Sequence, residues 1–290
     1  MTVLILLIGA GWREWRRRRL PEERSLLVPV ATASVLLVVA GLALFAGGIV
    51  LFAVIAGVML CGIAEYSTMI GLDRGYRSLL MVWSEAGLLA AAHRAIELIL
   101  LMPLGLFLAA TLIPIATGRV AGAHRQMSGV LFGHILVGLP MAFVVLIRSA
   151  QPWGTRLLLL VVAGAWLADT CSYVIGSKVG GPKLRPTVSP AKTWSGLIGG
   201  FFGAVVGVVI IDAALSPVTV GIVHKILLGG AIATCAIWGD LIESVVKRDF
   251  HVKDAGVALP GFGGVLDRFD SLFISIPVAY CIALGDNHFG

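Results

Sequence analysis

Hydrophobic residues follow one another along this chain in long runs, which short polar segments interrupt. A helix needs about 20 apolar residues to cross a bilayer. The uncharged stretch 26–64 predicts two such helices with a turn near Gly47, and the shorter runs 79–92 and 271–284 predict weaker ones. Five further runs are long enough for one helix each: 96–116, 129–147, 154–175, 194–215 and 222–242. The pattern predicts an all-α, polytopic membrane protein with about eight or nine transmembrane helices.

Composition supports the same class. Hydrophobic residues make up 58% of the chain and charged residues 13%, and the mean hydropathy is +0.98. A soluble domain carries about 25% charged residues, so the charges here are too few to cover a soluble body. The composition also excludes intrinsic disorder, and four cysteines in apolar stretches are too few for a disulfide scaffold. The net charge of +6 fits membrane orientation, so we expect no nucleic acid partner.

Basic residues indicate which side of the membrane each loop occupies. Six arginines lie within residues 13–24, which predicts a cytoplasmic N-terminus by the positive-inside rule. The loop 176–192 holds four basic residues and no acid, and it falls on the same side if 79–92 counts as a span. Residues 1–10 are apolar, but their charges follow them, which is the wrong order for a secretory signal peptide. We therefore expect an integral membrane protein with its active site facing the cytoplasm.

Unusual polar residues gather in the second half of the chain. They divide it into an N-terminal multispan hydrophobic region, 1–165, and a C-terminal catalytic membrane region with cytoplasmic loops, 166–290. An ionisable group inside a span costs on the order of 2.5–3.5 kcal/mol, so an acid there indicates function. Asp240, Ser244 and Lys247 are spaced i, i+4 and i+7 and would share one helix face. Four acids at one membrane surface would favour Mg²⁺, which binds carboxylates together with substrate phosphates: Asp169, Asp240, Asp267 and Asp270.

The basic loop before the run 194–215 predicts an anion site. Ser189 is a suitable helix N-cap and Pro190 a suitable first helical residue. Free backbone N–H groups there, with Lys192 and Thr193 in the first turn, would bind a triphosphate or a lipid phosphate. The alternative is a basic loop that only touches anionic headgroups. The sequence contains neither a P-loop nor a GxGxxG motif, so a nucleotide site would be of another kind.

Several blocks in this half are spaced as in a known family. They read Ser-Pro-Ala-Lys-Thr-Trp at 189–194, Gly-Asp-Leu-Ile-Glu-Ser at 239–244, Ser-Val-Val-Lys-Arg-Asp-Phe-His-Val-Lys-Asp at 244–254 and Pro-Gly-Phe-Gly-Gly-Val-Leu-Asp-Arg-Phe-Asp at 260–270. These blocks resemble the motifs of the phosphatidate cytidylyltransferase (CDP-diacylglycerol synthase) family, over about residues 166–280. Two positions differ: Phe262 stands where the family usually has His, and Ser195 where it often has Glu or Gln. Phe262 can neither donate a hydrogen bond nor take a proton, so any such role is lost there.

The resemblance implies an Mg²⁺-dependent nucleotidyltransferase of phospholipid biosynthesis, with a second cation such as K⁺. It would transfer the cytidylyl group of CTP to phosphatidic acid, giving CDP-diacylglycerol and pyrophosphate. The implied catalytic residues are Asp240, Ser244, Lys247, Arg248 and Asp267. The implied substrate-binding residues are Ser189, Lys192, Thr193, Lys253, Asp254, Gly263, Gly264 and Arg268. The implied Mg²⁺ ligands are Asp240 and Asp267, supported by Asp270 or Asp169.

Two other functions fit parts of the pattern. A CTP-dependent kinase of a membrane lipid alcohol would share a membrane-embedded nucleotide site. A transporter would also place polar groups at helix ends, but it would show matching broken segments in two halves, whereas the acids here lie at one end of the chain. Separately, Gly199, Gly203 and Gly207 repeat every four residues, which predicts close helix packing. The packing partner would be another helix of the same chain or a second copy in a homodimer within the lipid bilayer.

Overall fold

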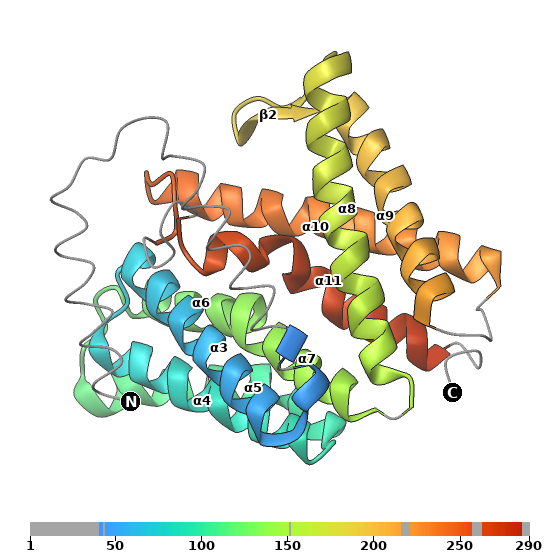
Figure 1. The fold of residues 1–290 in the computed structure, drawn as a ribbon. Helices are drawn as coiled ribbons and strands as arrows, with labels where there is room; N and C mark the ends of the chain where they lie inside the picture. Colours follow the sequence, from blue (N-terminus) through green and yellow to red (C-terminus); the bar gives the residue numbers. More distant parts are fainter. Residues whose placement is uncertain (1–40, 43, 151, 216–220, 257–262, 286–290) are drawn as a thin grey trace, which may run out of the picture.

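The computed structural model describes residues 41–42, 44–150, 152–215, 221–256 and 263–285. The N-terminal arginines, most of the first predicted span, the loop 216–219 and Phe262 lie outside these residues. The described chain is helical apart from one short hairpin (Figure 1). Its elements are α3 (Gly48–Ile70), α4 (Arg74–Ala92), α5 (Ile96–Thr117), α6 (Ala123–Gly133), the π-helical turn η2 (His134–Gly138), α7 (Leu139–Ser149), α8 (Gly154–Val179), β1 (Lys183–Arg185), β2 (Ser189–Thr193), α9 (Trp194–Leu215), α10 (Ile222–Asp249) and α11 (Leu266–Gly285).

The apolar runs of the sequence form helices with nearly the predicted bounds. The run 194–215 is α9 with no change of bounds, whereas α10 and α11 extend beyond their runs by polar turns. The predicted turn at Gly47 is confirmed, because Gly47, directly before α3, and Gly48, its first residue, have φ values of 60° and 50°. The added polar turns carry Lys247 and Asp267, two of the predicted catalytic residues.

Seven helices in the described residues are long and apolar enough to cross a membrane: α3, α5, the continuous helix Ala123–Ser149, α8, α9, α10 and α11. This confirms an all-α polytopic membrane protein, with seven candidate spans in that part of the chain rather than eight or nine. The run 79–92 does form a helix, α4, but α4 is not among the candidates and carries Arg74, Arg77 and Glu85. The sequence argument that the basic loop 176–192 and the N-terminus lie on the same side of the membrane required 79–92 to be a span. It therefore loses that support.

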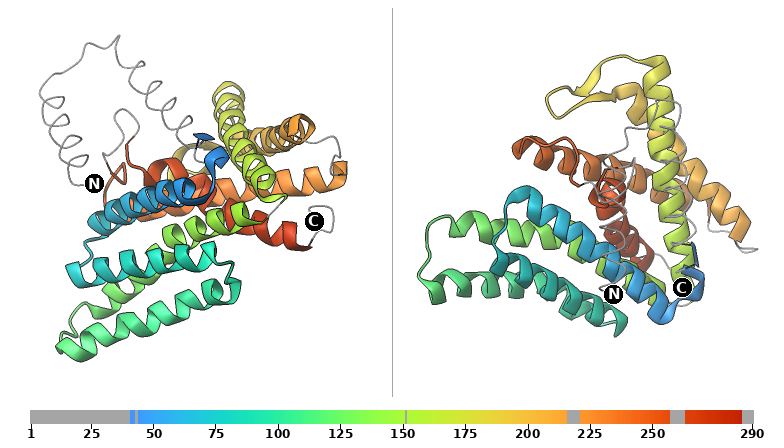
Figure 2. Two further views of the ribbon diagram at one scale, coloured as in Figure 1. Left: turned by 60° about the horizontal axis from the view of Figure 1, so that its bottom comes forward. Right: turned by 60° about the vertical axis from the view of Figure 1, so that its left-hand side comes forward.

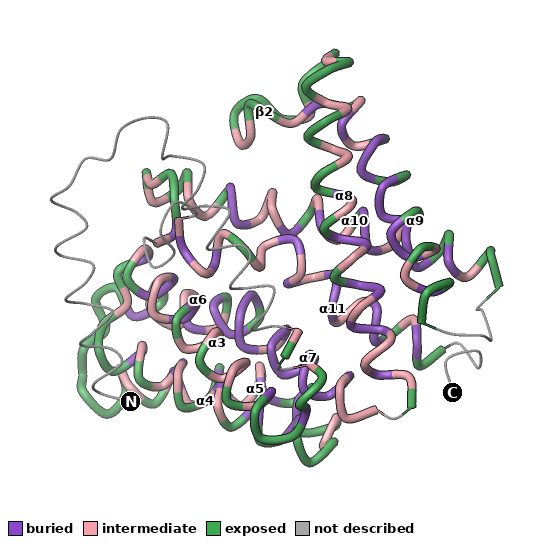
Figure 3. The backbone as a smooth tube through the Cα atoms, in the orientation of Figure 1, coloured by how far each residue is buried: buried purple, intermediate pink, exposed green. Residues whose placement is uncertain are grey.

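The helices form two groups that meet at α10 and α11 (Figures 1 and 2). Helices α3 to α7 pack into a bundle whose core contains Met59, Leu80 and Ile147. Helices α8 and α9 form a long pair that crosses α10 and α11 and carries the hairpin at one end. Buried residues lie where the helices face each other (Figure 3). Outward-facing side chains such as Leu100 and Phe202 are apolar, as a lipid-facing surface requires.

Small residues allow α8 and α9 to approach closely. A Cβ built on Gly207 would lie 2.9 Å from the carbonyl oxygen of Ala163, and one on Gly203 would meet the Leu167 carbonyl and Cys171. The glycine repeat predicted from sequence is therefore used for packing within the chain. This face gives no support to a homodimer.

Helix α8 runs through residues 165 and 166, where the sequence suggested a boundary between two regions.

A buried ion triad joins α8, α9 and α10 at the end of the α8–α9 pair that lies away from the hairpin. Asp212 of α9 is fully buried and pairs with Arg156 of α8 and with Lys225 of α10, whose Nζ lies 2.8 Å from Oδ2. At a rise of about 1.5 Å per residue, Lys225 lies roughly 22 Å along α10 from Asp240. The triad therefore connects three helices far from the acids predicted to be functional.

Candidate active site

Helix α10 carries the acid, hydroxyl and amine that the sequence placed on one face. The helix continues without interruption to Asp249, so Asp240, Ser244 and Lys247 do share a face. The Ser244 hydroxyl donates a hydrogen bond to Oδ1 of Asp240 over 3.3 Å. Asp240 is half-buried, which leaves its second oxygen open to a cation.

That cation comes from the basic hairpin. Lys192 of β2 extends its Nζ to 2.5 Å from Oδ2 of Asp240, and both side chains stay partly exposed. The predicted helix start at Ser189 and Pro190 is wrong: both residues lie in β2, which pairs antiparallel with β1, and α9 begins at Trp194. Proline lacks an N–H and is accepted equally at a first helical turn and in an edge strand, so the sequence did not distinguish the two.

Thr193 caps the helix that follows the hairpin. Its buried Oγ1 accepts the backbone N–H of Gly196 over 3.1 Å, three residues on, as an N-cap does. Ser195 lies 3.0 Å from the same oxygen and donates to the carbonyl of Gly180. The helix start on which the expected anion site depended is therefore not formed at Ser189 and Pro190, and Thr193 caps α9 instead. Phosphate binding by the hairpin stays a prediction. Lys192 is the hairpin residue that reaches the acids.

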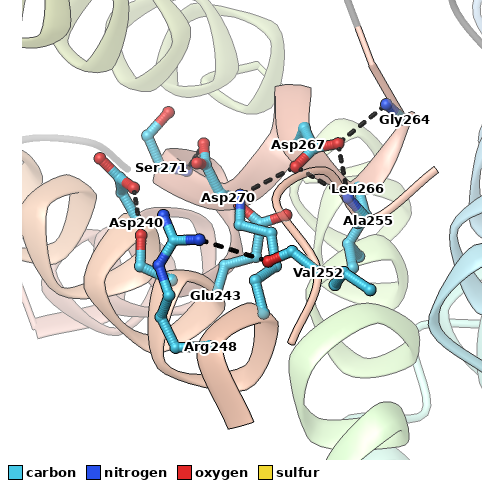
Figure 4. A network of polar contacts seen from close by, with 12 residues as sticks. Asp240, Glu243, Arg248, Val252, Ala255, Gly264, Leu266, Asp267, Asp270 and Ser271 are labelled. Carbon is cyan, nitrogen blue, oxygen red and sulfur yellow. Dashed lines mark hydrogen bonds and ion pairs between the residues drawn. The ribbon is translucent and has the colours of Figure 1, made fainter. Parts of the chain in front are cut away.

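Asp267 organises the chain between α10 and α11. Its Oδ1 lies 2.8 Å from Lys247 Nζ, and its carboxylate accepts backbone N–H groups from Ala255 and from Gly264, the latter over 2.8 Å (Figure 4). Gly263 has a φ of 83°, which glycine adopts readily. A carboxylate so fully occupied by protein donors is placed to position Lys247 and the loop.

The remaining acids lie around Asp240. Asp169 of α8 interacts with the Ser271 hydroxyl and electrostatically with Asp240, and Asp270 of α11 interacts with both Asp240 and Asp169. The structure thus brings Asp169, Asp240 and Asp270 into one region and holds Asp267 beside Lys247. In the residues described, no group of three acidic, His or Cys side chains is close enough to form a ready metal site.

Two carboxylates at the site were not predicted. Glu243 of α10 is fully buried, lies 3.2 Å from Lys247 Nζ and interacts with Asp270. Glu65 of α3 accepts the backbone N–H of Leu266 over 3.0 Å. The cost of an acid in a span, the signal that identified Asp240, could have identified both.

The other predicted residues lie at the rim. Arg248 is exposed and donates to the carbonyl of Val252 over 3.3 Å, and Arg268 is exposed but interacts electrostatically with Asp169. Lys253 and Asp254 are exposed on the segment after α10. Lys192 and Lys247, by comparison, are each in ionic contact with an acid of the site.

A cavity of about 710 Å³ lies on a different face of α10. Apolar side chains of α3, α6 and α10 form most of its lining, including Phe132, Trp238 and Leu241. Arg125 and Asp249 lie at the ends of their helices and give it a polar rim. None of the predicted site residues lines this cavity, so it is separate from the region that holds the acids and lysines.

Comparison with known proteins identifies relatives. The sequence profile of the cytidylyltransferase family matches residues 28–284. The phosphatidate cytidylyltransferase of Brucella suis is 35% identical over 181 residues, which cover 62% of this chain and 64% of that protein. The enzyme of that name from Rickettsia bellii is 33% identical over 164 residues, covering 55% and 71% of the two chains. The one from Thermotoga maritima is 35% identical over 136 residues, covering 46% and 50%.

The matched part thus spans 64% of the length of the Brucella suis relative. The matches to the three relatives cover between 46% and 62% of this chain, whereas the family profile covers nearly all of it, including α3 to α7. The N-terminal bundle, which the sequence motifs did not reach, is therefore part of the same family pattern. The chain belongs to the cytidylyltransferase family.

Proposed function

We propose that this protein transfers the cytidylyl group of CTP to phosphatidic acid, giving CDP-diacylglycerol and pyrophosphate. One observation carries the proposal: Lys192 and Lys247 are each held against an acid, Asp240 and Asp267, where α8, α10 and α11 meet. Transfer of a nucleotidyl group needs cations at fixed positions, because the negative charge of the triphosphate must be neutralised and the reacting groups must be aligned. Acids beside such cations hold them in place. The names of the relatives from Brucella suis and Rickettsia bellii support the choice of lipid substrate.

In this proposal a phosphate oxygen of phosphatidic acid attacks the α-phosphorus of CTP. The new phosphorus–oxygen bond forms as the bond from the α-phosphorus to the bridging oxygen of pyrophosphate breaks. The attacking phosphate is already ionised, so no general base is required. Lys192 and Lys247 would stabilise the negative charge that develops, with Arg248 near the leaving group, and Ser244 would orient a phosphate oxygen.

Divalent metal is part of the same proposal. Asp169, Asp240 and Asp270 lie near one another, and the buried Glu243 lies beside Asp270; a cation bound there would stabilise the ionised form of these carboxyl groups. Mg²⁺ binds through one or two carboxylates together with substrate phosphates, so a complete protein cage is not required. When bound, Mg²⁺ would neutralise the triphosphate. Asp240 and Asp270 are the better placed ligands, because Asp240 is partly exposed and its partner Lys192 could turn to the phosphates. Asp267 is held by Lys247 and by two backbone N–H groups. A second cation such as K⁺ would fit near Asp169.

The setting of the reaction is also proposed. The protein would lie in a bilayer with the ends of α8, α10 and α11 that carry the acids facing the cytoplasm, where CTP is available. A homodimer belongs to the proposal as well, with an interface other than the glycine face of α9, which α8 covers. Light scattering of the purified protein measures that oligomeric state.

Turnover by the purified protein with CTP, Mg²⁺ and phosphatidate tests the function. We expect CDP-lipid and pyrophosphate, a kcat lower by roughly 10²–10³-fold in Asp240→Ala and Asp267→Ala, and normal turnover in Asp249→Asn, an exposed acid of the same helix. Full activity in both alanine variants would show that the site is wrongly assigned. Formation of CDP and a phosphorylated lipid alcohol would instead identify a kinase.

A further inference from the structure

Glu65 joins the N-terminal bundle to the candidate active site. It lies in α3, and its Oε2 accepts the backbone N–H of Leu266, the first residue of α11, over 3.0 Å and a separation of 201 residues. The first N–H groups of a helix have no partner within that helix. A carboxylate at this position satisfies one of them and interacts favourably with the helix dipole. Glu65 thus caps α11 from a distant part of the chain.

The same carboxylate lies against both ends of the loop that joins α10 to α11. We call residues 255–256 and 263–264 the loop base. A Cβ built on Gly256 would lie 2.7 Å from Cγ of Glu65, and one on Gly264 would lie 2.9 Å from Cδ of the same side chain. Glycine at these two positions therefore leaves room for Glu65 between the two arms of the loop.

Asp267 holds the loop base from α11. It accepts N–H groups from Ala255 and Gly264, one from each arm, and it also binds Lys247 Nζ. Two carboxylates, one from each half of the chain, thus close the same loop base. Because Asp267 contacts both the loop base and Lys247, a displacement of the base would shift the amine that the proposed reaction needs.

We infer that Glu65 is a positioning residue, which fixes the loop base and, through Asp267, the place of Lys247. The inference rests on the proposed function for its kinetic consequence but not for its structural one. Glu65 acts through Leu266, Gly256 and Gly264 and is not assigned a contact with substrate. The N-terminal bundle then has a role in the reaction, because one of its helices helps to set the geometry of the site.

The test compares Glu65→Ala, which removes the acceptor, with Glu65→Gln, which keeps one. Glu97→Ala, an exposed acid of α5, is the matched control. Hydrogen exchange of the purified full chain should rise roughly tenfold or more at the amides of the loop base and Leu266 in Glu65→Ala, with no change in α9. The glutamine variant and the control should exchange as wild type does.

Kinetics supply the second measurement. With CTP and phosphatidate, kcat should fall about tenfold or more in Glu65→Ala with little change in KM for CTP, because Lys247 stabilises charge that develops in the transition state. Most activity should return in Glu65→Gln. Wild-type exchange at the loop base in Glu65→Ala, or a rise spread over all helices, would overturn the inference. Absence of turnover in the wild type together with the expected local exchange would refute the proposed function and leave the positioning role standing.

Discussion

Lys247 is the side chain on which the charge balance of the site depends. Its Nζ lies 2.8 Å from Asp267 and 3.2 Å from Glu243, and the Glu243 side chain is fully buried. An isolated carboxylate is costly to bury, and a cation within ionic contact offsets that cost. Lys253 provides the contrast, since it is exposed on the segment that follows α10.

We expect Lys247→Met to lower the free energy of unfolding by about 3–5 kcal/mol, because it leaves two acids without their cation. Lys253→Met should leave stability unchanged, even if it weakens substrate binding. Thermal unfolding in detergent compares the stability of each variant with that of the wild type. Adding Glu243→Gln to Lys247→Met should recover part of the loss, and equal melting temperatures for all these proteins would contradict the argument.

At the level of single residues, the sequence predicted a helix face but not its partners. Asp240, Ser244 and Lys247 were identified because α-helical spacing places them together. The contact of Lys192 with Asp240 was not predictable in the same way, since it depends on a hairpin that folds toward α10. Glu65 carries the same signal as Asp240, an acid in a span. Its contact was not predictable, because the partner is the backbone N–H of Leu266, 201 residues away, and backbone hydrogen bonds leave no pattern in the residue types.

Among the elements, the helices long enough to cross the membrane were predicted well, whereas the short hairpin was not predicted. A span of about 20 apolar residues needs no information from the rest of the chain. The strands β1 and β2 cover three and five residues and pair only with each other, so local propensity could not identify them. Glycines predicted to allow close packing did so, and the structure identified α8 as the partner of α9.

The triad of Arg156, Asp212 and Lys225 is the element-scale feature with the largest expected effect on stability. Asp212 is fully buried, and Asp212→Ala would leave two cations from α8 and α10 without their acid. We expect a loss of about 3–5 kcal/mol in the free energy of unfolding. The triple variant Arg156→Met, Asp212→Leu, Lys225→Met should be near wild type, because apolar replacement of a complete buried ion group is often neutral. The unfolding midpoints of Asp212→Ala and of the triple variant, both measured in detergent, test these expectations. A stable single variant would show that the triad does not hold these helices together.

For the whole molecule, the open question is which end of α10 faces the cytoplasm. The helix has 28 residues and is therefore about 42 Å long, more than the roughly 30 Å of a hydrocarbon core. Gly221 before it and Lys253 after it are both exposed, and they should lie on opposite sides of the membrane. Because the α4 helix is not a candidate span, counting spans from the N-terminus no longer decides the orientation.

Cysteine labelling decides it directly. In a variant without the four free cysteines, a membrane-impermeant maleimide should label Gly221→Cys in intact cells and Lys253→Cys only in inverted vesicles. The cysteines to be replaced are Cys61, Cys171, Cys235 and Cys281. CTP carries several negative charges and does not cross a bilayer unaided, so a cytidylyl transfer site has to face the compartment that supplies it. Labelling of Lys253→Cys from outside the cell would place Asp240 and Lys247 away from CTP and would count against the proposed reaction. Labelling of both positions from one side would show that α10 does not cross the membrane.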